Sequence, residues 1–270
     1  MNPKAIIVTG AGGGIGKVVV RDLLNLNYNI IATDLNLDSL RKSLPHSEEV
    51  QSNLLVMKHD VRNSKDWRII IDTALEKNWE LYGLINCAAV LKPNYINNID
   101  LSEIDFQIDI NTKGTIIGST IFSQYLKKNI KTGHIINISS LAGVAPIPGI
   151  ALYSASKFAV RGFSIALAYE LKRENIYVSV ICPDAVNTPM LDLQVAYEEA
   201  SLTFSGSTLE PSDISKLVIK CLKNKPIEIT IPIHRGILAK LGNFFPGLAH
   251  ILVEPLKKLG RRKQSIIKKN

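Results

Sequence analysis

The segment that most restricts the fold of this chain is its N-terminus. Residues 4–9 (KAIIVT) form a short apolar run typical of a buried strand, and a glycine-rich turn at residues 10–16 (GAGGGIG) separates it from a helix-prone run at 17–26. Glycines allow a tight turn and let a pyrophosphate approach a helix N-terminus, whose free N–H groups attract anions. A second strand pattern at 29–33 ends in Asp34, at the distance expected of an acid that binds an adenosine ribose. The order of these elements predicts a dinucleotide-binding site.

A second informative segment lies between residues 134 and 175. An apolar, β-prone run at 135–138 leads into Ser140, and a loop rich in glycine and proline precedes a helix-prone stretch with Tyr153 and Lys157. A spacing of four places Tyr153 and Lys157 on one helix face, where an ammonium favours the phenolate form of a phenol. Ser140, at a strand end, could hydrogen-bond a substrate oxygen at the same place. The alternative is an ordinary amphipathic helix, because this pair of residues alone is a weak motif.

Three further motifs accompany these two segments. They are Asn86-Cys87-Ala88-Ala89 after a strand pattern, Asn111 within a helix-prone run at 101–129, and PDAVNTPM at residues 183–190. Together with the glycine turn and the serine, tyrosine and lysine, they resemble the classical short-chain dehydrogenase/reductase family in order and separation, over residues 4 to about 232. Strand and helix patterns alternate throughout, which favours a single α/β domain. The resemblance implies a Rossmann fold with a doubly wound, mostly seven-stranded parallel sheet flanked by helices.

The resemblance also implies a role for each matched residue. Tyr153 would be the acid/base, Lys157 would lower its pKa and hold the nicotinamide ribose, Ser140 would orient the substrate oxygen, and Asn111 would bend its helix and hold a water linking the lysine to solvent. No metal is implied. The residues at the family's cofactor contacts are Gly10, Gly14, Ile15, Gly16, Asp34, Asp60, Val61, Asn86, Ala88, Tyr153, Lys157, Pro183 and Thr188.

Some of these matches have alternatives or departures. Asp60 could instead be a helix N-cap or turn acid, and Asn111 could be an exposed helix residue. Ala89 stands where the family usually has glycine, although alanine still leaves room for a ribose. Asp184 also replaces a usual glycine, beside the expected nicotinamide position. Residues 190–209 occupy the usual place of a substrate lid.

The expected activity is interconversion of a secondary alcohol and a ketone. Asp34 predicts NAD rather than NADP, because its carboxylate can bind ribose hydroxyls and would repel a 2′-phosphate. Two alternatives are an NADP-dependent carbonyl or 3-oxoacyl reductase and a non-catalytic dinucleotide-binding regulatory protein. The helix with Tyr153 is apolar nearly all round, which predicts packing on the sheet and on a partner subunit, as in the family's dimers and tetramers.

The C-terminal segment, residues 235–270, differs from the rest. It holds nine of the 32 Lys and Arg residues and one of the 24 acids, so it carries the whole net charge of +8. Apolar residues at three- and four-residue spacing, broken by Pro246, predict two short amphipathic helices. We interpret residues 1–234 as the catalytic domain and 235–270 as a basic amphipathic extension. The extension could lie on an anionic membrane and assist a lipophilic substrate such as a steroid, retinoid, terpenoid or lipid, or it could pack on its own protein or partner.

Other partners and compartments are less expected. Nucleic-acid binding is not predicted, because no base-reading module accompanies the basic residues. Three widely spaced cysteines suggest neither a disulfide framework nor a zinc site, which fits a reducing cytoplasm. No leader sequence or run of about 18 apolar residues is visible, so we expect a cytoplasmic protein, peripheral on a membrane if the extension binds lipid.

Overall fold

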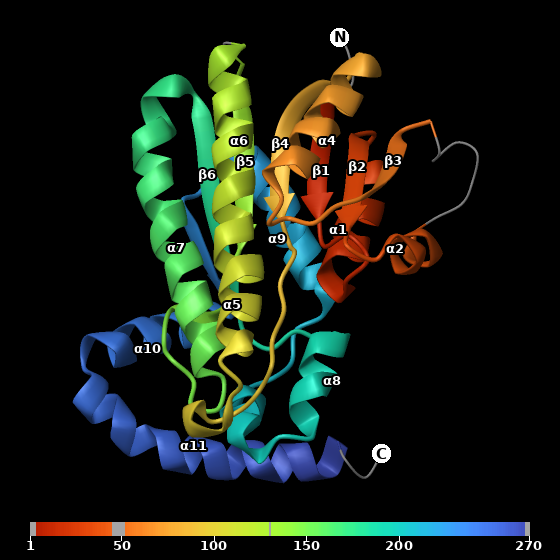
Figure 1. Ribbon diagram of the computed structural model, residues 1–270. Coiled ribbons are helices and arrows are strands. Elements are labelled where there is room, and N and C mark those ends of the chain that lie inside the picture. Colours follow the sequence, from red (N-terminus) through yellow and green to blue (C-terminus); the bar gives the residue numbers. More distant parts are fainter. Residues whose placement is uncertain (1–3, 45–51, 130, 268–270) are drawn as a thin grey trace.

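The computed structural model describes residues 4–44, 52–129 and 131–267 and has a seven-stranded parallel sheet at its centre (Figure 1). The strand order is β3-β2-β1-β4-β5-β6-β7. Chain order reverses between β1 and β4, which is where a doubly wound sheet forms its ligand crevice. The predicted Rossmann fold is therefore confirmed. The strands are β1 (Lys4–Thr9), β2 (Asn29–Asp34), β3 (Leu54–Lys58), β4 (Glu80–Asn86), β5 (Gly133–Ile138), β6 (Ile176–Pro183) and β7 (Glu228–Ile231).

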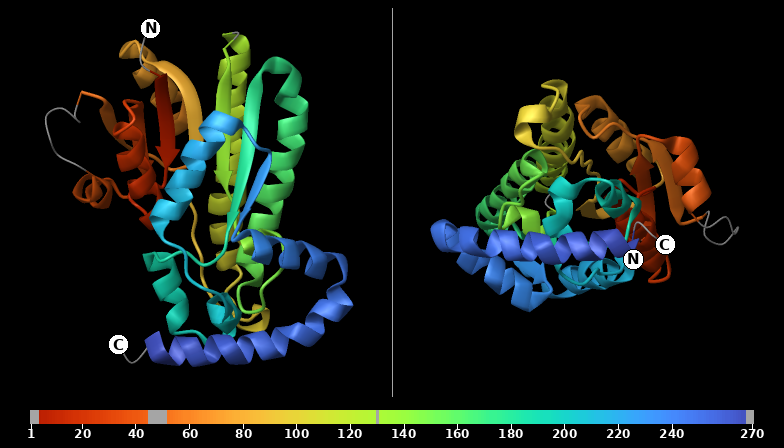
Figure 2. Two further views of the ribbon diagram at one scale, coloured as in Figure 1. Left: turned by 180° about the vertical axis from the view of Figure 1, so that it is seen from behind. Right: turned by 90° about the horizontal axis from the view of Figure 1, so that it is seen from below.

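Helices cover both faces of this sheet, as parallel strands require. One face carries α4 (Ser64–Glu76), α6 (Gly114–Lys128) and α7 (Ala151–Leu171), and the other carries α1 (Gly14–Leu24) and α9 (Pro211–Asn224), seen from behind in Figure 2. A hydrophobic core lies on each face of the sheet, and successive residues of β1 point to opposite faces. Ile6 and Val8 pack in the core beneath α1 and α9, and Ile7 packs in the core beneath α4, α6 and α7. The helix α2 (Leu37–Ser43) follows β2.

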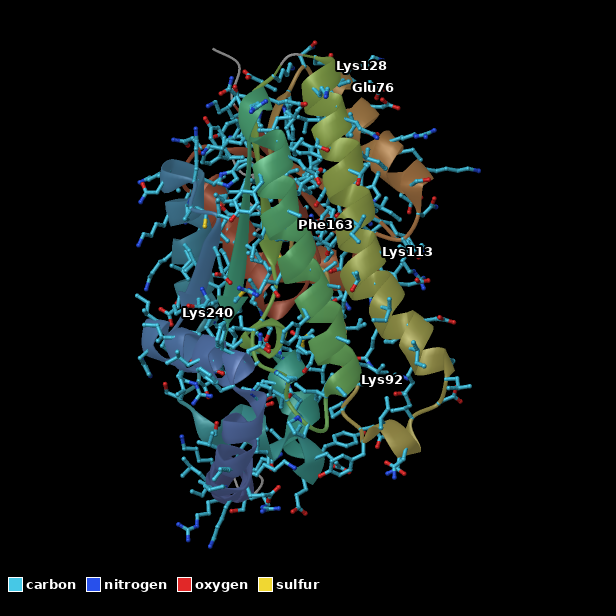
Figure 3. The ribbon with its side chains drawn as sticks, turned by 90° about the vertical axis from the view of Figure 1, so that its left-hand side faces the viewer. Glu76, Lys92, Lys113, Lys128, Phe163 and Lys240 are labelled. Atoms are coloured by element: carbon cyan, nitrogen blue, oxygen red, sulfur yellow. The ribbon has the colours of Figure 1, made fainter. Side chains whose placement is uncertain are left out.

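The helix predicted at 101–129 contains an irregular turn. It consists of α5 (Ser102–Ile108), a π-helical turn at Asp109–Lys113 and α6, and these run on without a loop beside α7, on which Phe163 is labelled in Figure 3. Gly114 follows the π turn, and a Cβ there would lie 2.5 Å from Cγ2 of Val61. The irregularity expected at Asn111 is thus present, as an inserted π turn of the kind often found at functional sites.

The C-terminal extension forms two helices separated at Pro246, as predicted. They are α10 (Ile233–Phe244) and α11 (Pro246–Ile267), so the prediction that both are short is wrong for α11. The last strand, β7, ends at Ile231, and α10 begins two residues later. Figure 1 shows α11 crossing the molecule below the carboxyl ends of the strands.

The second half of α11 packs against this protein itself. A Cβ at Gly260 would lie 1.8 Å from the carbonyl oxygen of Ser201, so only glycine allows the observed approach of α11 to the 3-10 segment η5 (Glu198–Ser205). Together with α8 (Pro189–Val195), η5 forms the segment expected to be the substrate lid. The alternative that the extension packs on its own protein is therefore correct for the second half of α11. Among the described residues, no helix has the length and apolarity needed to span a membrane.

Candidate active site

The glycine turn after β1 is shaped by close backbone contacts. Gly10 has a φ of +61°, and a Cβ there would lie 2.7 Å from the backbone of Ala88. A Cβ at Gly16 would lie 2.2 Å from the Gly10 carbonyl oxygen, and one at Gly14 would lie 2.5 Å from Cγ2 of Thr188. Side chains at these positions would clash, so glycine keeps the turn compact and brings it next to the exit of β6.

The first turn of α1 and the end of β2 form the two halves of a possible nucleotide site. No side chain caps α1 at Gly13, so the first N–H groups of this helix remain available to an anion. Asp34 accepts hydrogen bonds from the N–H of Gly12 at 3.0 Å and of Asn36 at 3.1 Å. A pyrophosphate at the helix N-terminus and a ribose at Asp34 fit this arrangement.

The predicted contact residues after β4 are held by hydrogen bonds to the neighbouring strands. The Thr9 hydroxyl accepts from the N–H groups of Cys87 and Ala88, both at 3.2 Å. The buried Asn86 side chain donates to Oδ1 of Asn137 on β5 at 2.8 Å. Asn86 therefore ties two strand ends together, and any contribution of its side chain to a cofactor would be indirect.

Asp60 and Val61 form the turn after β3. Asp60 binds the guanidinium of Arg62 through two contacts of 2.9 and 2.6 Å and also accepts from its backbone N–H. The hydrogen bond with Arg62 lowers the pKa of the Asp60 carboxyl. Val61 is buried, and its carbonyl accepts from the indole N–H of Trp67 at 3.0 Å. The turn-acid alternative for Asp60 thus describes its contacts in this structure, while cofactor contact stays a prediction for both residues.

Ser140, Tyr153 and Lys157 line one cavity of about 110 Å³ at the carboxyl end of the sheet. Tyr153 lies in the first turn of α7 and Lys157 one turn later, and the ammonium of Lys157 donates to the carbonyl of Ile138 at 3.0 Å. The hydroxyl oxygen of Ser140 accepts from the N–H of Ala142 at 3.0 Å. The fold therefore brings together the three residues predicted to carry the chemistry.

The electrostatics of this cavity differ from the sequence-based expectation. Burial raises the pKa of Tyr153 to about 12, and a hydrogen bond with Ser140 opposes that rise. Burial also lowers the pKa of Lys157 to about 8. The ammonium lies 5.6 Å from the Tyr153 ring centroid and donates instead to a carbonyl. Burial therefore disfavours the phenolate form of Tyr153, and the hydrogen bond with Ser140 offsets only part of that effect.

Asn111 is fully buried in the π turn, so the alternative of an exposed helix residue is wrong. Its amide nitrogen donates to the carbonyl of Val90 at 2.9 Å and to the hydroxyl of Ser156 at 3.0 Å, and its amide oxygen accepts from the N–H of Val90 at 2.8 Å. Asn111 thus links the segment after β4 to α7 beside Lys157. Its predicted role in a proton relay stays a prediction.

Comparison with known proteins identifies the family. The family model for short chain dehydrogenases matches residues 4–198. The chain belongs to this family. It is an oxidoreductase that acts on CH–OH groups with a nicotinamide nucleotide, and other chains of this fold are bound to NAD or NADP.

Two curated relatives and one solved structure illustrate the similarity. The chain is 31% identical to a diacetyl reductase [(S)-acetoin forming] of Staphylococcus epidermidis, over 84% of this chain and 94% of that protein. It is 32% identical to a 3-alpha-(or 20-beta)-hydroxysteroid dehydrogenase of Mycobacterium tuberculosis, over 80% of this chain and 81% of that protein. A short chain dehydrogenase/reductase from Burkholderia phymatum in complex with NAD has the same fold, with a TM-score of 0.82. The two sequences are 20% identical, and the match covers 92% of this chain and 95% of that chain.

One contact of this short-chain dehydrogenase could not be predicted from its family pattern. Asp184, which replaces the usual glycine, lines the cavity of Ser140, Tyr153 and Lys157 and forms an ion pair with Arg235 of α10. Burial raises the pKa of the Asp184 carboxyl, and Arg235 opposes that effect. The only sequence signal was that Arg235 is the first basic residue of the extension. Ala89, the other departure, also lines the cavity, while Pro183 and Thr188 border it from β6 and its exit.

Proposed function

We propose that this short-chain dehydrogenase interconverts a secondary alcohol and a ketone with NAD, on a lipophilic substrate. The observation that carries the proposal is the common cavity of Ser140, Tyr153 and Lys157 beside a glycine turn bordered by Asp34. The similarity to relatives named for diacetyl and for hydroxysteroids supports the reaction class, and these names span small and large substrates.

Ser140, Tyr153, Lys157 and Asn111 have different roles in the proposed proton transfer. NAD, when bound, accepts the hydride in the oxidative direction. In that direction the phenolate form of Tyr153 takes the alcohol proton and becomes the phenol, and in reduction the phenol returns the proton to the substrate oxygen. The Ser140 oxygen accepts from the Ala142 N–H, and its hydroxyl donates to the Pro183 carbonyl at 3.5 Å, so this proton turns from that carbonyl to the substrate oxygen when a substrate binds. Lys157 supplies positive charge next to the tyrosine, and Asn111 holds the surrounding backbone in place.

The charge at the end of β2 supports NAD as the cofactor. Asp34 is fixed against the glycine turn by the N–H of Gly12, where a ribose would lie. A 2′-phosphate there would meet this carboxylate and be repelled. An NADP-dependent carbonyl or 3-oxoacyl reductase is the second candidate, and a chain of the same fold is bound to NADP.

Two surfaces support partners for this enzyme. Small residues line the exposed side of α7, where a Cβ at Gly162 would meet nothing within 4 Å. This side of α7 suits contact with a second copy of the chain in a homodimer or homotetramer. On α10 and the start of α11, large apolar side chains are exposed: Ile233, Ile237, Phe244 and Ile251. Because the extension also carries the basic excess of the chain, we assign this apolar face to an anionic membrane surface.

Steady-state kinetics test the proposal. We expect a higher kcat/KM with NAD than with NADP, and with lipophilic than with small polar secondary alcohols. Tyr153→Phe removes the proton-transfer group alone and should lower kcat about 10²- to 10⁴-fold while NADH still binds, as measured by fluorescence titration. Preference for NADP or full activity of Tyr153→Phe would contradict the proposal. Cofactor binding without turnover on any alcohol or ketone would favour a regulatory protein instead.

A further inference from the structure

A second and larger cavity lies between the C-terminal helices and the loop that follows Ser140. Its volume is about 550 Å³, compared with about 110 Å³ for the catalytic cavity. Small-molecule sites are usually about 300–1,000 Å³ in volume, so only the larger of these two cavities has the size of a complete ligand site. We call it the extension cavity, because α10 and α11 supply much of its wall.

The wall of the extension cavity is predominantly apolar. Side chains from α10, α11 and the loop contribute, notably Leu238, Ala239, Leu241, Val253, Leu256 and Ile147. Its two charged residues, Asp184 and Arg235, form an ion pair with each other and so leave little net charge for a ligand to meet. Such a wall favours hydrocarbon over a polar or ionised ligand.

The extension cavity is held in shape by polar contacts on the lid. Lys263 donates to the carbonyl of Gly206 at 2.6 Å, and the buried amide of Gln264 donates to the carbonyls of Gln194 at 3.0 Å and Tyr197 at 2.8 Å. These bonds fix α11 on α8 and η5, while the Asp184 ion pair fixes α10 to the end of β6. The cavity is open to solvent on one side, and the segments that bound it are tied to the catalytic fold.

The two cavities share part of their walls. Leu141, Ile147 and Asp184 line both of them. Leu141 directly follows Ser140, so the shared wall begins one residue from the hydroxyl that would orient the substrate oxygen. A substrate with its oxygen at Ser140 and Tyr153 therefore lies beside residues that also line the extension cavity.

We propose that the extension cavity binds the aliphatic hydrocarbon portion of the substrate while its carbinol or carbonyl carbon lies in the catalytic cavity. This inference rests on the proposed alcohol dehydrogenase function and adds to it a location for the lipophilic part. The C-terminal extension is then a substrate-binding element of the enzyme, and substrates gain affinity from each methylene that enters the cavity.

A series of 2-alkanols from 2-butanol to 2-decanol tests this inference on the full-length enzyme with NAD. We expect kcat/KM to rise with chain length, by up to about fourfold for each methylene that is buried. Leu238→Trp fills the cavity from α10 and should lower kcat/KM for 2-decanol by about tenfold or more, with a change of less than about twofold for 2-butanol. Val253→Phe fills it from α11 and should act in the same direction.

The matched control is Ile237→Trp. Ile237 neighbours Leu238 on α10, has the same exposed fraction of 55%, and does not line the cavity. This variant should keep the wild-type chain-length profile. A flat profile in the wild type, or equal effects of Leu238→Trp and Ile237→Trp, would overturn the inference while turnover of short alcohols still supports the proposed function.

A binding measurement separates the inference from the proposed function. Calorimetric titration with 1-decanol in the absence of cofactor should detect binding to the wild type and to Ile237→Trp, and binding at least about tenfold weaker to Leu238→Trp. If no alcohol is turned over but this pattern holds, the proposed function fails and the cavity assignment stands. If 1-decanol does not bind the wild type, the cavity assignment fails.

Discussion

The ammonium of Lys157 is buried and donates to the carbonyl of Ile138 at 3.0 Å. Burial lowers its pKa from 10.5 to about 8. A group with this shift binds more protons in the unfolded than in the folded chain between these two values, so its effect on the free energy of unfolding becomes more favourable as the pH rises through that window. The proposed function therefore needs a positive charge at a place where burial disfavours it.

This conflict gives a prediction for stability. The free energy of unfolding of the wild type minus that of Lys157→Met should increase between pH 8 and 10.5, by about 3 kcal/mol at most. Urea denaturation of both proteins at pH 7.5, 9 and 10.5 measures the difference, and the comparison cancels the groups that the two proteins share. A difference that stays constant or falls with pH would show that burial does not lower the pKa of Lys157.

At the scale of elements, the ion pair between Asp184 and Arg235 connects α10 to the end of β6. The Asp184 side chain is 8% exposed, so removing its partner leaves a nearly buried carboxylate unpaired. Arg235→Met should lower the free energy of unfolding by about 3 kcal/mol. The double variant with Asp184→Gly, which restores the family's usual residue, should recover part of that loss.

A second ion pair from α10 provides the control. Lys240, labelled in Figure 3, contacts Glu228 of β7 at 2.5 Å, but its side chain is 46% exposed. Lys240→Met should therefore cost about 0–1 kcal/mol. Urea denaturation of the single and double variants gives the coupling free energy of Asp184 and Arg235, and a coupling near zero would contradict a structural role for this pair.

The same element shows how far sequence reasoning could go. Runs of apolar residues, the glycine turn and Pro246 are local signals, because each depends on residues close together in the sequence. The strands, the order of the site motifs along the chain and the break between α10 and α11 could therefore be predicted. The partner of Asp184 was not, because Arg235 lies 51 positions away and no local pattern connects them. The raised pKa of Tyr153 was also missed, since burial depends on tertiary packing around α7.

At the scale of the whole molecule, the extension combines two opposite surfaces. The second half of α11 is fixed to the lid, while α10 and the turn into α11 expose large apolar side chains, including Phe244 at 78%. Figure 2 shows these two helices at one end of the molecule, away from α4. The apolar face and the basic excess of residues 235–270 lie in the same part of the chain, as expected for a surface that meets anionic lipid.

Vesicle co-sedimentation tests this assignment. The full-length protein should sediment with vesicles containing phosphatidylserine, and less so with neutral vesicles or at high salt, because each basic residue near the surface adds about 1 kcal/mol. The double substitution Ile237→Glu and Phe244→Glu should abolish binding without removing α11 from the lid. Ile69→Glu is the control, since Ile69 on α4 is similarly exposed, at 56%, but lies on another part of the surface. The exposed face of α10 does not bind lipid if the protein fails to sediment with phosphatidylserine vesicles, or if Ile69→Glu reduces sedimentation as much as the double substitution does. A second copy of the chain is then the better candidate to cover this face.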